Sequence, residues 1–511
     1  FGNDGGSNIN ALVFDMSDGG KASFNNGILA GNIQGAGDEA GWTFGGAAIN
    51  PRKNGSAANG TVDLGSSSAK LKDIHFGGTI NGVGILADTT NFVDSILISQ
   101  DGGTGTLSSA SNNTGLGNEV FNALTSGTGN TALGESALKS NTSGGFNTAV
   151  GARSLDANTT GAGNVAVGED ALSGNTEGDD NVAIGQNALK SSTTGIRLTA
   201  IGQNALTANT TGHSNVAMGR SALGSNTTAD DNVAIGREAL FANTTGEDNV
   251  AIGNFALDAN TTANENTAVG YSALGANTTG TRNTSVGFQC GLVNTTGNDN
   301  VVLGHNSLSS NTTGSENTAI GRGVLNANTT AVHNTGVGYF ALLSNTTGNN
   351  NVAFGAESLE ANTTGSKNTA LGYAALESNT TADNNIAIGA GSLNLNTTGE
   401  NNTAVGTNAL DANTTASFNT AIGKAALGAN TTGTRNVAIG GLALDANTTA
   451  NDNTAVGYDS LTANTTGTFN VAVGAFAADA NTEGGNNVAV GRAALSANTT
   501  ASNNTAIGHQ T

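Results

Sequence analysis

Pairs of adjacent acidic residues are the first feature of this sequence that could do chemistry. Two of these pairs, Asp230-Asp231 and Glu247-Asp248, lie 17 residues apart. Carboxylate oxygens are hard ligands of the kind that Ca²⁺ prefers. If residues with this separation are neighbours in space, Asp230, Asp231, Glu247 and Asp248 form a candidate Ca²⁺ site. The alternative is that they are solvated turn residues whose charges keep neighbouring molecules apart.

A second set of candidates is aromatic, and its members are separated by multiples of 17 residues: Tyr271, Phe288, Tyr339, Tyr373 and Tyr458. The set includes every tyrosine of the chain. Because aromatic side chains combine a large apolar face with a polar edge, they are common in contact surfaces. We expect these five residues to be exposed and to form a contact surface for a binding partner. The alternative is that the rings only cover the edge of a neighbouring structural unit.

Catalytic and cofactor motifs are missing from the sequence. The histidines do not form a His-x-x-x-His pair, there is no Gly-x-Ser-x-Gly, and no Gly-Lys-Ser/Thr follows the glycines. Cys290 is the only cysteine, so we expect no disulfide within the chain and interpret this residue as a small buried hydrophobe. The sequence predicts no enzyme, no catalytic residue and no cofactor apart from the Ca²⁺ candidate, although a groove between subunits could still act on polysaccharide.

The separation of these candidates reflects a 17-residue unit that recurs from Asn113 to the end of the chain. One copy begins Asn266-Thr267-Ala268-Val269-Gly270, and its later part reads Ala273-Leu274 and Asn277-Thr278-Thr279. The first and last copies begin 391 residues apart, at Asn113 and Asn504, which gives 23 full units and a partial one. A fixed short period is typical of a solenoid, in which each unit packs only on its neighbours.

The residue pattern within the unit predicts how each coil is built. Positions 1–5 read as a short strand that ends at a Gly corner, positions 8 and 9 as a second strand, and Asn-Thr-Thr-Gly as a turn. We expect position 4, always apolar, to point into the coil, and the Ala at position 3 to face another copy of the chain. Stacked Asn residues would form amide ladders along a rod of about 110 Å.

Composition excludes several classes of protein. With 76 Gly but one Pro the chain is not collagen, and regularly placed apolar residues argue against disorder. A net charge of −21 argues against a nucleic-acid partner. The sequence contains no run of 18 apolar residues, so it predicts no membrane-spanning segment. The sequence begins at Phe1 without Met or a signal peptide, so we expect a processed or partial product.

The repeat resembles a known family of fibres. Val182-Ala183-Ile184-Gly185-Gln186-Asn187-Ala188 is similar to the head repeat of trimeric autotransporter adhesins, although the family unit is shorter. The resemblance implies a parallel β-roll, with three chains in each assembly and small strand residues near the contacts.

The first 112 residues resemble modules of tail fibres of tailed bacteriophages, particularly marine and cyanobacterial ones. The segments that carry this resemblance are 11–25, 63–74, 77–80, 94–99 and 103–108. Such fibres often carry Asn-Thr-Ala-Val-Gly repeats followed by a self-cleaving chaperone, whereas this sequence ends at His509-Gln510-Thr511. Removal of a chaperone or truncation of the chain would each account for that ending.

These observations predict an all-β protein with fibre shaft or joint modules at 1–112 and a parallel β-solenoid, or β-roll, of 17-residue coils at 113–511. We expect a homotrimeric structural fibre of a phage or tail-like particle, extracellular on the virion. Its partners would be other copies of itself, other tail or fibre proteins at the N-terminal end, and a host-surface glycan or envelope protein, which the five aromatic residues would contact. A bacterial cell-surface trimeric adhesin is the alternative. An ice-binding solenoid is more remote, because at most one threonine of each Asn-Thr-Thr turn can face outward.

Overall fold

The computed structural model describes residues 31–33, 41–45, 48–53, 56–57, 79–80, 83–89, 91–99 and 104–511, and describes side chains from residue 91 onward. The chain forms two compact units, Phe1–Phe76 and Gly77–Thr511. The described part of the first unit is an antiparallel sheet with the strand order β1 (Gly31–Ile33), β2 (Gly41–Gly45), β3 (Ala48–Lys53), β4 (Ser56–Ala57). The predicted fibre segments 11–25 and 63–74 lie outside the described residues.

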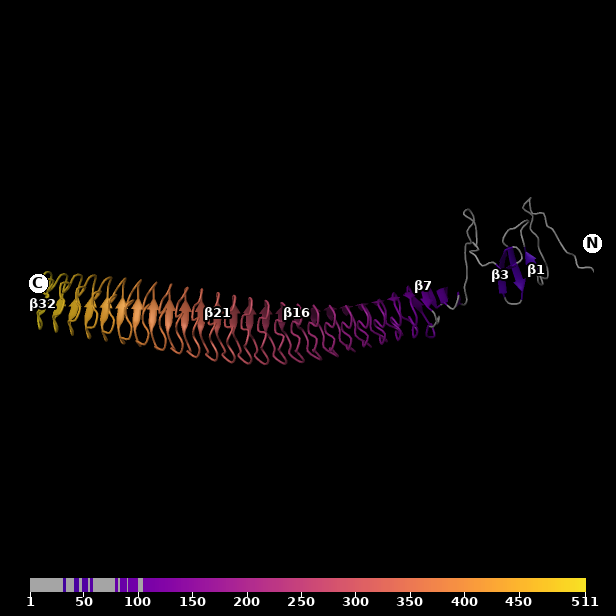
Figure 1. Cartoon of the computed structure of the whole chain (residues 1–511), viewed down its shortest axis with the longest axis horizontal. Coiled ribbons are helices and arrows are strands. Elements are labelled where there is room, and N and C mark those ends of the chain that lie inside the picture. Colours follow the sequence, from indigo (N-terminus) through magenta and orange to yellow (C-terminus); the bar gives the residue numbers. More distant parts are fainter. Residues whose placement is uncertain are drawn as a thin grey trace, which may run out of the picture. The chain divides into compact units, whose positions relative to one another are not determined.

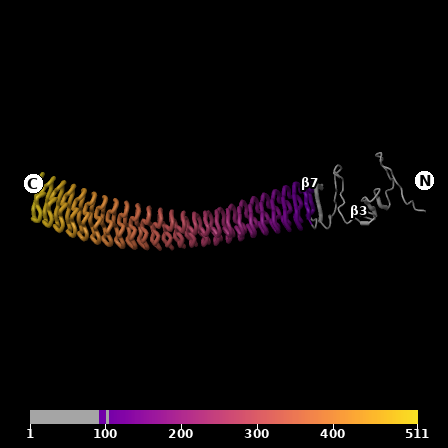
Figure 2. The backbone as a smooth tube through the Cα atoms, turned by 45° about the horizontal axis from the view of Figure 1, so that its top comes forward, coloured from indigo at the N-terminus to yellow at the C-terminus, as the bar shows by residue number. Residues whose placement is uncertain are grey.

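The second unit is a parallel β-solenoid, which confirms the predicted fold class (Figure 1). Its first strands are β5 (Thr79–Ile80), β6 (Val83–Thr89), β7 (Phe92–Ser99) and β8 (Ala110–Ser111). Each 17-residue coil then supplies one three-residue strand, and these strands pair in parallel and in register. Figure 2 shows the coils stacked in sequence order, with chain neighbours always adjacent. The coil strands are β9 (Thr114–Leu116), β10 (Thr131–Leu133), β11 (Thr148–Val150), β12 (Val165–Val167), β13 (Val182–Ile184), β14 (Thr199–Ile201), β15 (Val216–Met218), β16 (Val233–Ile235), β17 (Val250–Ile252), β18 (Thr267–Val269), β19 (Thr284–Val286), β20 (Val301–Leu303), β21 (Thr318–Ile320), β22 (Thr335–Val337), β23 (Val352–Phe354), β24 (Thr369–Leu371), β25 (Ile386–Ile388), β26 (Thr403–Val405), β27 (Thr420–Ile422), β28 (Val437–Ile439), β29 (Thr454–Val456), β30 (Val471–Val473), β31 (Val488–Val490) and β32 (Thr505–Ile507).

The orientation predicted for the strand side chains is wrong. Ala268 at position 3 is fully buried, whereas Ile252 at position 4 is 37% exposed, and this pattern holds along the stack. The interior explains the choice of Ala. A Cβ added to Gly336, at position 3, would collide with Val324 of the preceding coil and lie 3.8 Å from Leu342 Cδ1 of its own coil. Position 3 therefore packs on positions 8 and 9 across a thin coil rather than on another chain. Small residues predominate there, although Val302 is also accommodated and buried.

The second predicted strand is also absent from the described coils, because positions 6–11 run as consecutive turns. Position 9 has a left-handed backbone, with φ of 51° at both Leu257 and Leu274. This conformation is unfavourable for leucine. It turns the amides toward the adjacent coil, so that Leu257 N–H donates to the Ala273 carbonyl at 3.0 Å. Burial of the leucine side chain and this hydrogen bond offset the backbone strain.

Two buried asparagine ladders run through the solenoid, at positions 1 and 12. At position 1, Asn266 N–H donates to Asn249 Oδ1 at 3.0 Å, and Asn266 Oδ1 accepts from Asn283 N–H at 3.0 Å. At position 12, Asn277 Nδ2 donates to the Oδ1 of the preceding asparagine at 3.1 Å. Both asparagines of a coil also donate to one carbonyl, that of Gly280, at 2.9 Å. The amides of Asn266 and Asn277 each form two or more hydrogen bonds, so these polar side chains can lie in the interior without a large desolvation penalty.

Glycine at position 5 forms the corner after each strand. Gly202 has a φ of 135°, and a Cβ on it would lie 2.5 Å from the Gly219 carbonyl oxygen of the next coil. Only glycine combines this backbone conformation with so close an approach. The corner therefore fixes the spacing of the coils as well as the turn.

The N-terminal end of the coil stack is closed by β7, which pairs antiparallel with β6 and parallel with β9. Ser95 Oγ accepts from Asn113 N–H at 2.8 Å, so a serine takes the place of an asparagine at the end of the first ladder. Leu97 of β7 lies against the small residue Gly115, where a Cβ would come within 2.9 Å of Leu97 Cδ1. The first coil thus stacks directly on β7.

No helix able to cross a bilayer is found in the described part of the chain.

Candidate functional site

Positions 6, 7 and 10 of the coil vary in residue type from one coil to the next. We call the surface that they form the outer corner. Tyr271 and Phe288 lie at position 6 of adjacent coils, and their rings stack with centroids 5.5 Å apart and planes at 13°. His305 continues the stack at 5.1 Å and 12° from Phe288. Phe255, at position 7, meets Tyr271 edge-on. The stack leaves Tyr271 and Phe288 each 44% exposed, as the sequence predicted for this position.

The same row continues with Arg322 and Tyr339 on the next two coils. The Arg322 guanidinium lies 5.7 Å from the ring centre of Tyr339 and 5.6 Å from that of Phe340, within the range of a cation–π interaction. Tyr339 and Phe340 also contact each other, with centroids 3.9 Å apart. Aromatic and cationic groups therefore occupy five consecutive coils, a continuity that the sequence prediction missed because it considered Tyr and Phe but not His305 and Arg322.

Tyr373 and Tyr458 lie on separate coils of the same corner. Tyr373 is 60% exposed, and its hydrogen bond to Glu357 raises the pKa of its phenol. Tyr458 is 52% exposed and meets Phe476 edge-on at 5.7 Å. The structure thus brings Tyr271, Phe288 and Tyr339 into one row of consecutive coils and places Tyr373 and Tyr458 on separate coils outside that row.

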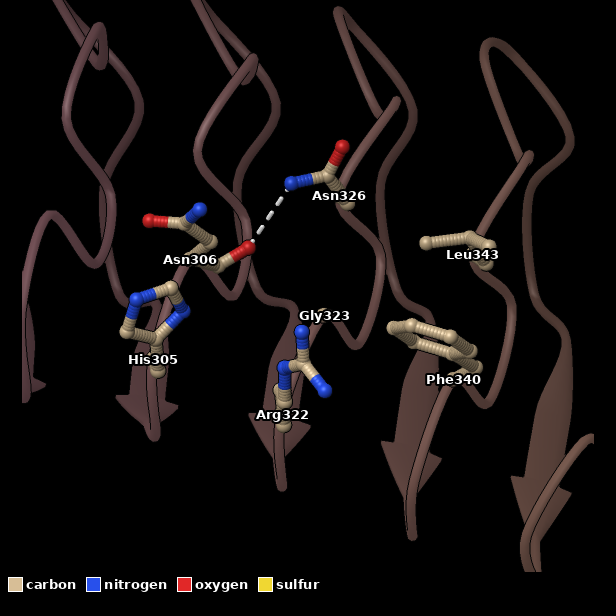
Figure 3. A pocket seen from close by; sticks show the side chains of 7 residues that line it. All are labelled: His305, Asn306, Arg322, Gly323, Asn326, Phe340 and Leu343. Carbon is tan, nitrogen blue, oxygen red and sulfur yellow. Dashed lines mark hydrogen bonds between the residues drawn. The ribbon is translucent and has the colours of Figure 1, made fainter.

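A hollow of about 150 Å³ opens beside Arg322 (Figure 3). It is lined by positions 6, 7 and 10 of three successive coils: His305, Asn306, Arg322, Gly323, Asn326, Phe340 and Leu343. Gly323 accounts for the opening, since most coils carry a side chain at position 7. A Cβ at Gly323 would come within 2.7 Å of Phe340 Cδ1, so the absence of a side chain also lets the Phe340 ring lie over this position.

The polar groups of the hollow are incompletely paired. Asn326 Nδ2 donates to the Asn306 carbonyl at 2.8 Å and to Ser309 Oγ at 2.7 Å, which fixes the Asn326 amide. By contrast, Asn306 Oδ1 is buried and has no hydrogen-bond partner. Among the described residues Arg322 forms no ion pair, whereas Arg153 pairs with Asp170 at 2.6 Å. The hollow therefore offers an uncompensated cation beside the fixed amide of Asn326.

The predicted Ca²⁺ residues lie at the turn on positions 16 and 17. Asp230 Oδ1 accepts from the His213 backbone N–H at 2.6 Å, and Asp231, Glu247 and Asp248 are exposed. In the described chain, the group of three acidic side chains whose ligand atoms lie within 4.8 Å of one another is Glu357, Glu360 and Glu377. The predicted four residues do not form such a group, and calcium binding by them stays a prediction.

The glutamate group is a second arrangement that sequence reading missed, because its members lie at positions 7 and 10 rather than in adjacent pairs. Burial raises the pKa of Glu360, and the charges of Glu357 and Glu377 add to this effect. Asn394 Nδ2 donates to Glu377 Oε2 at 2.7 Å. Three such carboxylates have the chemistry to hold a hard cation.

Cys290 and the two threonines of the turn differ in how far their side chains are buried. Cys290 is fully buried at position 8, and burial raises the pKa of its thiol, so the thiol is poorly reactive. In the Asn-Thr-Thr turn the first threonine is half-buried, and Thr261 Oγ1 donates to the Thr278 carbonyl at 3.2 Å. The second, such as Thr262, is exposed.

The strand face carries many of the exposed apolar side chains of the described coils. It consists of positions 2 and 4, and exposed members include Ile235, Ile252, Leu303, Val352 and Phe354, with exposed fractions from 36% to 55%. Position 4 is apolar in every coil, and because the coils stack in register its side chains form an unbroken apolar stripe, beside which position 2 alternates between Val or Ile and Thr. Comparison with protein-family models, with curated proteins and with solved structures found no match for this chain.

Proposed function

We propose that this chain is the rod of an extracellular fibre, in which several copies pack through their strand faces. The observation that carries the proposal is the exposure of apolar residues at position 4 in coil after coil, for example 39% at Ile184 and 38% at Ile439. A contiguous apolar surface of more than a few hundred Å² is uncommon on a monomer and marks an interaction site. The strand face therefore requires an occupant.

The dimensions of the strand face suit a second copy of the same chain. Strands of three residues that repeat every 17 residues along a stack of about 110 Å give a face of roughly 1,100 Å². A stable protein interface needs about 800 Å² from each partner. Another rod has the same spacing between coils, so its side chains stay in step along the whole length. A partner with a different repeat would lose register after a few coils.

A fibre of this kind acts by presentation. The rod holds its outer corners at fixed intervals, and several copies compensate for weak single contacts by binding together. The resemblance of the repeat to trimeric heads favours three copies, and that of the N-terminal segments favours the tail fibre of a phage or tail-like particle. The host surface would be the partner of the outer corner.

The experiment that tests this proposal is the solution mass of the purified chain. We expect about three times the chain mass of 50.0 kDa in sedimentation equilibrium. Lysine at Ile235 and Ile252 together should dissociate the assembly, since it places charge in the apolar face without disturbing the interior. Lysine at the exposed turn residues Thr245 and Thr262 is the matched control and should leave the mass unchanged. A monomeric wild-type rod would contradict the proposal.

A further inference from the structure

We propose that the hollow between His305 and Phe340 is a binding site for a carboxylated sugar residue of the kind found in acidic surface polysaccharides. The inference deepens the proposed fibre function and rests on it for its biological role. The hollow, at about 150 Å³, is smaller than the pockets of about 300–1,000 Å³ that hold drug-sized ligands. It suits a single sugar ring rather than a longer ligand.

Arg322 is the group that selects an anion. In a chain with a net charge of −21, most carboxylates repel an acidic ligand, yet Arg322 is in no ion pair among the described residues. Its guanidinium lies 5.7 and 5.6 Å from the ring centres of Tyr339 and Phe340, so the two rings favour a position of the cation beside the hollow. A planar guanidinium matches a carboxylate with two parallel hydrogen bonds.

The other walls of the hollow suit a ring that has one apolar face and several hydroxyl groups. Figure 3 shows Arg322 between the His305 and Phe340 rings, which provide flat surfaces for stacking. Asn306 and Asn326 also line the hollow, and amide groups of this kind can form hydrogen bonds with ligand hydroxyl groups. A simple anion would use Arg322 and leave the rest of the hollow empty.

Position 7 decides whether the hollow exists. Gly323 has a φ of 66°, and a methyl group there would displace the Phe340 ring, whose Cδ1 would lie 2.7 Å from the added Cβ. Alanine is already present at position 7 elsewhere, at Ala374 with a φ of 51°, so the backbone accepts it. Gly391 occupies the same position on another coil with a φ of 65° and provides a matched control.

The test is titration of the full chain with free glucuronic acid and free N-acetylneuraminic acid, followed by calorimetry or saturation-transfer NMR. Glucose and acetate serve as the neutral and the minimal anionic probes. We expect at least one of the acidic sugars to bind, and glucose and acetate to bind at least tenfold more weakly. Arg322→Gln and Gly323→Ala should each lower the affinity at least tenfold, with Arg322→Lys recovering part of the loss.

Two variants control for general effects of the substitutions. Arg237→Gln removes a guanidinium that lies 4.3 Å from the Phe255 ring centre outside the hollow, and Gly391→Ala repeats the glycine change elsewhere. Both should bind like the wild type. The site is refuted if neither acidic sugar binds, if acetate binds as tightly, or if Arg322→Gln and Gly323→Ala bind unchanged. Solution mass, measured on the same samples, separates the two proposals, since sugar binding by a monomer would support the site and contradict the fibre assembly.

Discussion

The inner wall of the solenoid and its outer corner share one 17-residue period but use it in opposite ways. Positions 1, 3 and 12 repeat Asn, Ala and Asn, because each of these residues contacts its own counterpart in the next coil, as Asn249, Asn266 and Asn283 do. The outer corner changes from coil to coil, from the ion pair of Arg153 and Asp170 to the stacked rings of Tyr271 and Phe288. The inner wall therefore determines the architecture, and the outer corner distinguishes one stretch of the rod from another.

The largest effect should follow from breaking an inner ladder. Asn266→Ala removes the acceptor for the buried Asn283 N–H and one of the donors to the Gly280 carbonyl. We expect the free energy of unfolding to fall by about 2–4 kcal/mol, because the buried Asn283 N–H would be shielded from water and would form no new hydrogen bond. Hydrogen exchange followed by mass spectrometry should show faster opening of the coils around residue 266.

A substitution on the outside provides the contrast. Thr262→Ala, at the exposed position of the turn, should leave exchange in the same coils unchanged. Equal exchange in the Asn266→Ala and Thr262→Ala variants would show that the ladders contribute nothing to stability.

An intermediate effect is expected where both ladders are already interrupted. Ser192 replaces Asn at position 12 and Leu198 replaces Asn at position 1, and Asn175 Oδ1 and Ser192 Oγ are buried without partners. A Cβ at Gly195 would lie 2.7 Å from Leu198 Cδ1 and 2.9 Å from Ser192 Oγ, so the two substitutions meet at one place. Either single change to Asn should destabilise these coils by about 1–2 kcal/mol, through crowding or a void.

The double variant Ser192→Asn/Leu198→Asn should recover the loss and exceed wild-type stability, because it completes both ladders. Local hydrogen exchange in the four proteins gives the coupling between the two positions. Purely additive effects would contradict the view that these residues compensate for each other.

The smallest effect concerns acidic residues at position 10 of the outer corner. Burial raises the pKa of Asp258, Asp411 and Asp445 above the ordinary value of an aspartate, about 3.9. Groups with a raised pKa stabilise the folded state when protonated, and that contribution is lost as the pH rises through the raised pKa. Lowering the pH from 7 to about 4.5 should therefore raise Tm by about 2 °C.

The opposite trend sets in at lower pH. Hydrogen bonds from Arg282 and Arg435 lower the pKa of Asp299 and Asp452, so their contribution to stability disappears only as the pH falls through those lowered values. Replacing Asp258, Asp411 and Asp445 with Asn should reduce the rise in Tm between pH 7 and 4.5, because these three groups then no longer take up protons. An undiminished rise in this variant would show that these residues do not cause the effect.

The sequence was sufficient to predict the parts of the fold that follow from the period. The parallel stacking, the glycine corner and the stacked asparagines depend on residues such as Gly202 and Asn266, whose backbone or amide requirements are local. The side-chain directions at positions 3 and 4 were predicted wrongly. A small residue such as Ala268 is compatible both with close contact to another chain and with the interior of a thin coil. The width of the coil, which decides between these alternatives, depends on the turns at positions 6–11, and the left-handed leucines there have no signal in a strand pattern.

The candidate site was predictable only in part. Position 6 could be identified as variable and exposed, but the hollow depends on the absence of a side chain at Gly323 and on the orientation of Phe340. Neither follows from residue type. Reading position 6 for every aromatic and cationic residue, from Tyr271 through His305 to Arg322, would have found the continuous row.

The central claim is that the strand face is covered by copies of the chain, and cysteine labelling tests it most directly. In a Cys290→Ala background, Ile252→Cys places a thiol on the strand face and Thr262→Cys places one on the turn, and both parent residues are exposed in the single chain. We predict that the thiol at 252 reacts at least tenfold more slowly with a soluble maleimide than the thiol at 262. Equal rates at the two positions would show that the strand face is open to solvent and would contradict the account.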